Sequence, residues 1–553
     1  MARLDRLVTA KGIAQLAAVI GRQFSYELLQ AVSQLDASTL QRELGRLVEA
    51  EIVYQRGLLP QAAYTFKHAL IQDAAYQSLL KSTRQQYHQR IGQVLEGQFP
   101  ETVDQQPELL AHHYTEAGLN EQAVRYWHKA GQRASARSAH VEAISHLRQG
   151  LALLQTLPAT RERSQRALPL HIALGASLIG TKGYADPEVG QTYLRARDLC
   201  HALEDPQQLV PVLRGLQNYY AAHAEHQRAQ ALCEQLLTLA QQAQDPAMLL
   251  VAYHSLGTVL FEQGAVATAH TYLVQGIALD DPQQPRVSAL LYGQDAGVAC
   301  LSWAAWTFWY LGYSDQGRMR LQEALARAEQ MAHPFSLVYA LTSAAVFHQL
   351  RREVRAAHER AEATLRLAME QGFPHWKERA VVLRGWTLAH QGEAKEGMAQ
   401  LTQGLSTFRA TGAESNRSYF LALLAEAHGT LGEPEAGLAV LTEALTFAET
   451  TGERWYEAEL YRLQGALLVQ QSSDNPTEAE TCFHHAMAIA QNQSAKSWEL
   501  RAATSLSKLW QQQGKRQAAH DLLAPVYDWF TEGFDTADLK DAKALLEELE
   551  EGR

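Results

Sequence analysis

The most regular feature of the chain is a stripe of apolar and small residues that recurs with helical spacing. In "YHSLGTVLFEQGAVATAHTYLVQGI", which starts at Tyr253, such residues follow one another at intervals of 3, 1, 3, 4, 5, 4 and 3, ending at Gly276. Intervals of three and four place side chains on one face of an α-helix. The stretch therefore predicts two amphipathic helices that meet at a turn around Gly264.

Glycines mark the ends of these predicted helices. Gly372, Gly412 and Gly452 are 40 residues apart, and Gly392 and Gly432 form a second series at the same spacing, offset by 20 residues. Glycine commonly ends a helix because it adopts positive φ without steric penalty. Two glycine series in one period predict two helices in each 40-residue unit.

The units share a small residue on the first helix, a glycine at the turn and a small residue on the second helix. Further examples are "LRGWTLAHQGEAKEGMAQLTQGL" and "LLAEAHGTLGEPEAGLAVLTEAL". This pattern resembles the tetratricopeptide repeat, with a period near 40 in place of the usual 34 residues. The resemblance implies an all-α fold, a right-handed superhelical solenoid of about ten or eleven helix pairs over residues 101–534. We expect Asp280–Asp295 to lengthen one connection and to bend or divide the array.

The first hundred residues lack the 40-residue pattern. Three apolar helical segments, the third capped by Asp36, precede two β-rich segments, "IVYQRG" and "AAYTFKHA". Three helices and a hairpin predict a small winged-helix domain over residues 1–100. Its third helix, Ser38–Ala50, could enter a DNA groove. However, the segment has eleven basic and eight acidic residues, a balance that favours a structural, domain-joining role over phosphate binding.

Three stretches support a more specific resemblance: "AQLAAVIGRQFSYELLQAV", "FKHALIQDAAYQSLLKSTRQQYHQRI" and "PELLAHHYTEAGLNEQAVRYW". They resemble the region that follows the nucleotide-binding domain in bacterial STAND-type signalling ATPases, many of which carry a class III adenylate/guanylate cyclase domain. The resemblance implies that this chain is the sensor region of such a regulator. Its partners would be a protein or peptide ligand and the ATPase and cyclase domains upstream.

The end of the chain, "LLAPVYDWFTEGFDTADLKDAKALLEEL", contains acids and aromatics that a catalytic loop could also contain. Residues 535–553, however, place Leu539, Leu545 and Leu549 on one helical face and acids, including Asp538, on the other. A terminal solenoid repeat needs a polar outer surface. We therefore expect a capping helix whose acids are solvated.

Composition narrows the function classes. The formal net charge of −11 argues against a general binder of nucleic acid or membrane surfaces. The four cysteines lie far apart, with no CxxC motif, which favours reduced thiols and a cytoplasmic location. The apolar stretch Gly297–Tyr313 is too short for a transmembrane helix, and the N-terminus lacks the apolar core of a signal peptide.

Motifs for chemistry are missing from the sequence. It contains no G-x-x-x-x-G-K-[ST] phosphate loop and no hydrolase signature. The adjacent histidines at 112–113 and 484–485 point about 100° apart on a helix, so neither pair is a good metal chelate. We expect no enzymatic activity, no cofactor and no metal site in this chain.

Aromatic residues give the strongest hint of a binding surface. Alignment of the units places several large or charged side chains on the concave side of the first helices, where solenoids hold their partners. The alternative is that these residues fill the core between helices. The candidate residues are His254, Phe261, Trp306, Trp309, Tyr310, Arg379 and Trp386.

Three functional hypotheses follow from the sequence. The first is a non-catalytic sensor and scaffold that binds a protein or peptide partner in the superhelical groove and regulates an upstream ATPase or nucleotide cyclase. The second is a DNA-binding transcriptional regulator that uses the winged helix. The third is an enzyme, a fragment that shares the cyclase or ATPase activity of the full-length family.

Overall fold

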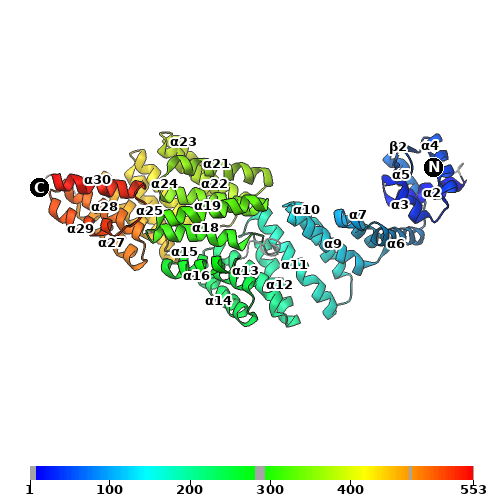
Figure 1. Ribbon diagram of the computed structural model, residues 1–553, viewed down its shortest axis with the longest axis horizontal. Helices are drawn as coiled ribbons and strands as arrows, with labels where there is room; N and C mark the ends of the chain where they lie inside the picture. The colour runs from blue at the N-terminus through cyan, green and yellow to red at the C-terminus, as the bar shows by residue number, and fades with distance from the viewer. Residues whose placement is uncertain (1–7, 281–292, 472–475, 552–553) are drawn as a thin grey trace. The chain divides into compact units, whose positions relative to one another are not determined.

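The computed structural model describes residues 8–280, 293–471 and 476–551, which form two compact units (Figure 1). Unit 1 comprises Met1–Ala134 and Glu142–Leu170, and unit 2 comprises Ser135–Val141 and His171–Arg553. Most of the connection predicted to bend the array, residues 281–292, lies outside the described residues. The domain boundaries near residues 100 and 534 remain predictions.

Unit 1 begins with three helices and a small antiparallel sheet. The strand order is β1-β3-β2, with Phe24 opposite Tyr64 and Tyr54 opposite Thr65. The two strands expected from the sequence are confirmed as β2 and β3, while β1 was not predicted. The elements are α2 (Val8–Ile20), β1 (Gln23–Ser25), α3 (Tyr26–Ser33), α4 (Ala37–Glu49), β2 (Val53–Arg56) and β3 (Ala63–Phe66).

The start of α4 is explained by its cap. The Asp36 side chain accepts a hydrogen bond from the backbone N–H of Thr39 at 2.9 Å, as expected for an aspartate at this position. Bonds from Ser38 and Thr39 lower the pKa of Asp36 to about 2. On the same helix the buried Glu43 pairs with Arg42 and Arg46, each at 3.2 Å.

Helices make up the rest of unit 1. Their apolar faces, together with those of the first helices and the strands, form a core that runs from Ala10 to Ala130. The boundary with unit 2 passes through the last helices of the series. These helices are α5 (Ala69–Gln77), α6 (Lys81–Gln98), α7 (Pro100–Gln105), α8 (Pro107–Ala117), α9 (Asn120–Ala136), α10 (His140–Gln155) and α11 (Arg161–Lys182).

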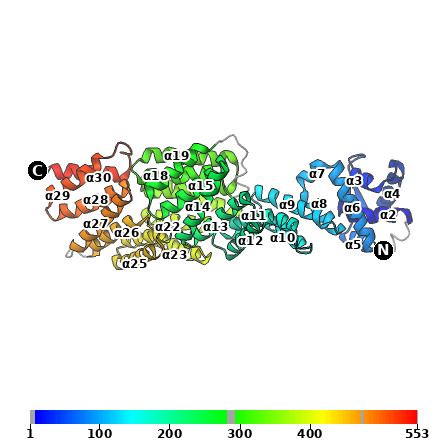
Figure 2. The same ribbon diagram turned by 90° about the horizontal axis from the view of Figure 1, so that it is seen from below.

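Unit 2 is built from helices of similar length that pack as consecutive pairs (Figures 1 and 2). Within the described residues, eight pairs run from α13/α14 to α28/α29, which confirms the predicted all-α solenoid of helix pairs. The helices are α12 (Pro187–Leu203), α13 (Pro206–Ala222), α14 (His226–Ala243), α15 (Pro246–Glu262), α16 (Val266–Leu279), α18 (Ala296–Tyr310), α19 (Ser314–Met331), α20 (Pro334–Leu350), α21 (Val354–Gln371), α22 (Pro374–His390), α23 (Ala394–Ala410), α24 (Arg417–Thr430), α25 (Pro434–Thr451), α26 (Glu457–Gln471), α27 (Pro476–Asn492), α28 (Lys496–Gln512), α29 (Arg516–Asp528) and α30 (Ala537–Glu551).

Local sequence explains where these helices begin and end. Asp205 and Asp245 cap α13 and α15 through their carboxylates, and a proline follows each of them at the first helical position. Gly372 and Gly452 cap the C-terminal ends of α21 and α25 in the left-handed conformation, with φ of +70° and +79°. The expected glycine caps are thus confirmed at these two ends.

Successive turns of the superhelix in unit 2 are joined by hydrogen bonds between distant loops. The carbonyl of Ala222 accepts from the backbone N–H of Glu414, and the carbonyl of Glu262 accepts from that of Arg454, each at 2.8 Å. The Ser497 hydroxyl donates to a carbonyl 188 residues earlier in the chain. Along α13 to α28, segments of one turn of the superhelix therefore contact segments of the next turn.

The last helix, α30, packs on the C-terminal pairs with Leu539, Leu545 and Leu549 buried, as the apolar face predicted. The expectation that its acids are solvated was wrong for Asp538. This carboxylate is 7% exposed and accepts from Arg501 at 2.6 Å. A buried guanidinium on the facing helix requires a counter-charge, which helical periodicity alone could not show.

The backbones of α22 and α23 approach each other closely, and this contact provides a test of how the two helices of a repeat pack. Gly397 of α23 lies so close to α22 that a Cβ atom there would be 2.5 Å from the backbone nitrogen of Ala389. Gly397→Ala is expected to lower the free energy of unfolding by about 1–3 kcal/mol, measured by urea denaturation, because the added methyl group must separate two backbones.

The matched control is Gly45→Ala, at an exposed helical position with no heavy atom within 4 Å of the added methyl group. This change is expected to leave the free energy of unfolding unchanged or to raise it by up to about 1 kcal/mol. Equal effects of both substitutions would contradict the close packing of α22 and α23.

Candidate functional site

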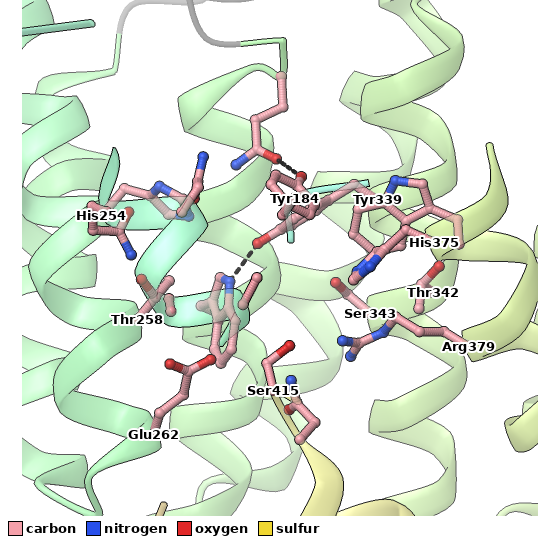
Figure 3. A pocket seen from close by; sticks show the side chains of 18 of the residues that line it. Tyr184, His254, Thr258, Glu262, Tyr339, Thr342, Ser343, His375, Arg379 and Ser415 are labelled. Atoms are coloured by element: carbon pink, nitrogen blue, oxygen red, sulfur yellow. Dashed lines mark hydrogen bonds between the residues drawn. The ribbon is translucent and has the colours of Figure 1, made fainter. Parts of the chain in front are cut away.

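The first helices of five successive pairs surround one pocket, which we call the aromatic pocket (Figure 3). Its empty volume, including the opening to solvent, is about 720 Å³. Side chains come from α13, α15, α18, α20 and α22 and from the loops before α12, α18 and α24. The aromatic lining residues are Tyr184, Trp303, Trp306, Tyr339 and Trp376, and the charged and imidazole side chains are Arg214, His254, Glu262, His375 and Arg379.

The 40-residue repeat explains why side chains of different chemistry lie together. Arg214 and His254 occupy equivalent positions on successive first helices, as do Tyr339 and Arg379. In Figure 3, His254 and Glu262 lie on one side of the pocket, with Tyr339 and Arg379 on the other. The scaffold is repeated, but each repeat contributes a different functional group.

Hydrogen bonds hold the indoles of Trp303 and Trp306, which form one side of the pocket and are called the aromatic wall. The Trp306 indole donates to the carbonyl of Ser343 at 3.0 Å, and the Trp303 indole donates to the hydroxyl of Tyr339. Trp303 and Trp306 contact each other edge to face, with ring centroids 4.7 Å apart. Both indoles are thereby held against the pocket as an ordered surface for an apolar group.

On the polar side of the pocket, Arg214 forms hydrogen bonds with two neighbouring side chains. Its guanidinium donates to Nδ1 of His254 at 3.1 Å and to the Gln217 side chain. Because arginine can only donate, Nδ1 of His254 must be the acceptor and Nε2 must carry the proton. Burial and the nearby arginine hold the pKa of His254 well below its usual value, so the ring is neutral.

Several buried polar atoms of the pocket have no hydrogen-bond partner within the described part of the chain. They include Nε2 of His254, Nδ1 of His375, Nε1 of Trp376 and Nε of Arg379. The pKa of His375 is also held well below its usual value, by burial and then by Arg379. Unpaired buried donors cost free energy, so a ligand that accepts hydrogen bonds would relieve this cost.

The seven residues expected from the sequence divide into two groups. His254, Trp306 and Arg379 line the aromatic pocket. The other four lie outside its lining and are buried in the core between helices, with no more than 2% of their surface exposed: Phe261, Trp309, Tyr310 and Trp386. Phe261 packs behind the wall, with its ring centroid 5.4 Å from that of Trp303.

Sequence reasoning overlooked several lining residues, among them Arg214, Tyr184, Trp303 and Trp376. The 40-residue period could have indicated Arg214, since it precedes His254 by one repeat. Tyr184 gave no such signal because it lies in a loop, where only the folded superhelix brings it to the pocket. Its hydroxyl donates to the side chain of Gln294 at 3.2 Å.

The described ranges show neither a metal cluster nor a membrane-spanning helix. They contain no cluster of three or more His, Cys, Asp or Glu side chains suited to a metal ion. None of their helices combines the length and apolar character needed to cross a bilayer.

Comparison with known proteins places the fold. No protein-family model matches the chain. An uncharacterized protein of Rhizobium meliloti (strain 1021) is 26% identical over 511 residues, which are 92% of this chain. The chain spans about half, 49%, of that relative's length.

Among solved structures, a Rap protein complexed with competence and sporulation factor is similar in fold. The TM-score is 0.50 at 12% identity, over 68% of this chain and 99% of the Rap chain. A STAND signal transduction ATPase with a tetratricopeptide repeat sensor from Pyrococcus horikoshii matches over 98% of this chain and 65% of its own length. Its TM-score is 0.32 at 12% identity. The chain thus shares a helical-repeat fold with the Rap protein.

Proposed function

We propose that this chain is a non-catalytic sensor whose aromatic pocket binds a peptide segment. The observation that carries the proposal is the convergence of an ordered indole wall and unpaired buried donors in one pocket. Aromatic and arginine side chains in desolvated pockets provide much of the free energy of peptide recognition. The Rap structure, which is complexed with a factor, supports the same use of the fold in this chain.

We propose further that the sensor regulates an ATPase or nucleotide cyclase module elsewhere in a longer cytoplasmic protein. The Rhizobium relative, about twice as long as the matched region, is consistent with additional domains in such a protein. A ligand would act by favouring one arrangement of the helix pairs, because a ligand shifts a conformational equilibrium by its differential affinity.

We propose that the first elements of unit 1 form a winged helix with a domain-joining role. The order of three helices and three antiparallel strands supports this assignment. On α4, the helix that would enter DNA, Arg42 and Arg46 pair with the buried Glu43. These pairs reduce the positive charge available to phosphates, which argues against DNA binding.

Affinity selection from a pool of random hexapeptides tests the sensor proposal. Wild-type protein is expected to retain peptides that mass spectrometry identifies. Trp303→Ala should weaken their binding about 30-fold, since losing a central aromatic contact costs about 2 kcal/mol. Trp303 is suitable because its half-buried indole borders the pocket.

The control is Trp510→Ala, which removes another half-buried indole, on α28 and outside the pocket lining. It should leave peptide affinity unchanged, and thermal unfolding of both variants identifies any loss of fold. Retention of no peptide above the blank, or equal retention by folded Trp303→Ala, would refute the proposed function.

A further inference from the structure

The aromatic pocket contains two buried arginines that form no ion pair with an acid of the described residues. Arg214 and Arg379 are 4% and 7% exposed. The hydrogen bonds of Arg214 go to neutral groups of Gln217 and His254. Arg379 lies over the rings of Trp376 and Phe420, at 5.9 and 5.5 Å, with its Nε unpaired. Among the ion pairs of the described residues, none involves either guanidinium.

Two other buried arginines of unit 2, in contrast to Arg214 and Arg379, form ion pairs with acids. Arg501 is 8% exposed and pairs with Asp538 and Glu459, at 2.6 and 3.4 Å. Arg351 is 1% exposed and pairs with Glu353 at 2.8 Å. Elsewhere, therefore, the fold supplies a carboxylate for a buried guanidinium. An unpaired buried charge destabilises the folded state, and a ligand that brings the opposite charge removes that destabilisation.

Both guanidiniums act on the same part of the pocket. Burial raises the pKa of Tyr184 and of Tyr339, and the charges of Arg214 and Arg379 oppose the rise at each phenol. The one carboxylate of the lining, Glu262, lies 3.4 Å from the buried His226. Both arginines thus line the same pocket, where the charge of Glu262 acts on Arg379, but no carboxylate of the described residues forms an ion pair with either of them.

We propose that the aromatic pocket recognises a carboxylate of its peptide ligand, held by Arg214 and Arg379 while an apolar part of the ligand lies on Trp303 and Trp306. Guanidinium groups bind carboxylates with two parallel hydrogen bonds, which gives orientation as well as affinity. A phosphate dianion fits less well, because Glu262 in the same wall would repel its second charge. The inference rests on the proposed peptide-binding function.

Three hexapeptide pools test this inference on the full chain. The first contains Asp and Glu and has free C-termini, the second is the same pool with Asn, Gln and C-terminal amides, and the third is the second pool with phosphoserine added. Wild type is expected to retain the first pool at least tenfold more strongly than the other two. Arg379→Gln should reduce retention of the first pool to that of the second.

Arg355→Gln is the matched control, because the Arg355 side chain is 93% exposed and lies outside the pocket. It should bind all pools as wild type does. Equal retention of the first two pools would overturn the carboxylate inference and leave peptide binding intact. Stronger retention of the third pool would overturn it in favour of a phosphopeptide.

Thermal unfolding without ligand provides a second readout. Arg379→Gln removes a buried charge that forms no ion pair within the described residues, so its midpoint should equal or exceed that of wild type. Arg501→Gln removes a guanidinium that pairs with both Asp538 and Glu459, leaves Asp538 only its pair with Arg352, and should lower the midpoint by several degrees. If the protein retains none of the pools, the proposed peptide binding is refuted. The unfolding midpoints of the two variants then test separately whether the pocket arginines lack an anionic partner. A midpoint of Arg379→Gln lowered as far as that of Arg501→Gln would overturn the inference.

Discussion

Trp309→Ala is expected to lower the free energy of unfolding by about 3–5 kcal/mol, as for other large-to-small changes in a core. The Trp309 side chain is 2% exposed, and its ring centroid lies 4.9 Å from that of Trp498 on α28. The guanidinium of Arg501 lies over the same indole at 5.6 Å. Removing the indole would leave a cavity where two turns of the superhelix meet. Urea denaturation of both proteins measures the loss.

The aromatic pocket should be unaffected by this change, because Trp309 does not line it. Peptide affinity per folded molecule is therefore expected to equal that of wild type. Trp303→Ala provides the opposite pattern, with weakened affinity and a smaller loss of stability. A Trp309→Ala protein of normal stability and reduced affinity would show that this indole contacts the ligand and that the core assignment is wrong.

Acidification from pH 7 to pH 4 is expected to destabilise unit 2 by about 3 kcal/mol through His140 alone. Burial, followed by the charge of His333, lowers the pKa of His140 from 6.5 to about 4. The unfolded chain binds a proton near pH 6.5 while the folded ring stays neutral, so the contribution is complete above pH 6.5 and is lost as the pH falls towards 4. The loss grows by about 1.4 kcal/mol for each pH unit between the two pKa values and levels off near each of them, which gives about 3 kcal/mol between pH 7 and pH 4.

His140→Phe isolates this contribution in urea denaturation at pH 7 and pH 5. Within the part of the chain that the structure describes, neither ring nitrogen of His140 has a hydrogen-bond partner. The ring packs against Phe335 and Phe373, so a phenyl ring suits the site. The variant should lose about 2 kcal/mol less than wild type between these pH values. His484→Phe, at a half-exposed position, should retain the wild-type loss. Equal losses in wild type and His140→Phe would disprove the assignment.

The sequence alone determined the repeat and the helix boundaries, because both depend on local chemistry. Apolar residues at helical spacing define the faces that pair, aspartate and proline start helices such as α13 and α15, and glycines such as Gly372 and Gly452 end them. Asp36 and the two β-rich segments were recognised on the same basis. Each of these signals lies within a few residues of the structure it specifies.

Only the tertiary structure decided which residues line the aromatic pocket. Trp306 and Trp309 are three residues apart on α18, yet one lines the aromatic pocket and the other lies in the core. In a solenoid with an open concave side, both indoles could have reached a partner. The difference arises because the next turn of the superhelix packs against α18: the hydroxyl of Ser497 donates to the backbone carbonyl of Trp309.

Charge pairing was likewise decided by the superhelix. Asp538 pairs with a buried arginine on another helix, whereas Arg214 and Arg379 form no ion pair with any acid in the described ranges. Nothing in the neighbouring sequence of these residues separates the two cases. Helical periodicity specifies which face of its own helix a residue occupies. Which residues pack against that face depends on parts of the chain that lie tens to hundreds of positions away. For a buried charged side chain, those residues determine whether the protein itself provides the opposite charge.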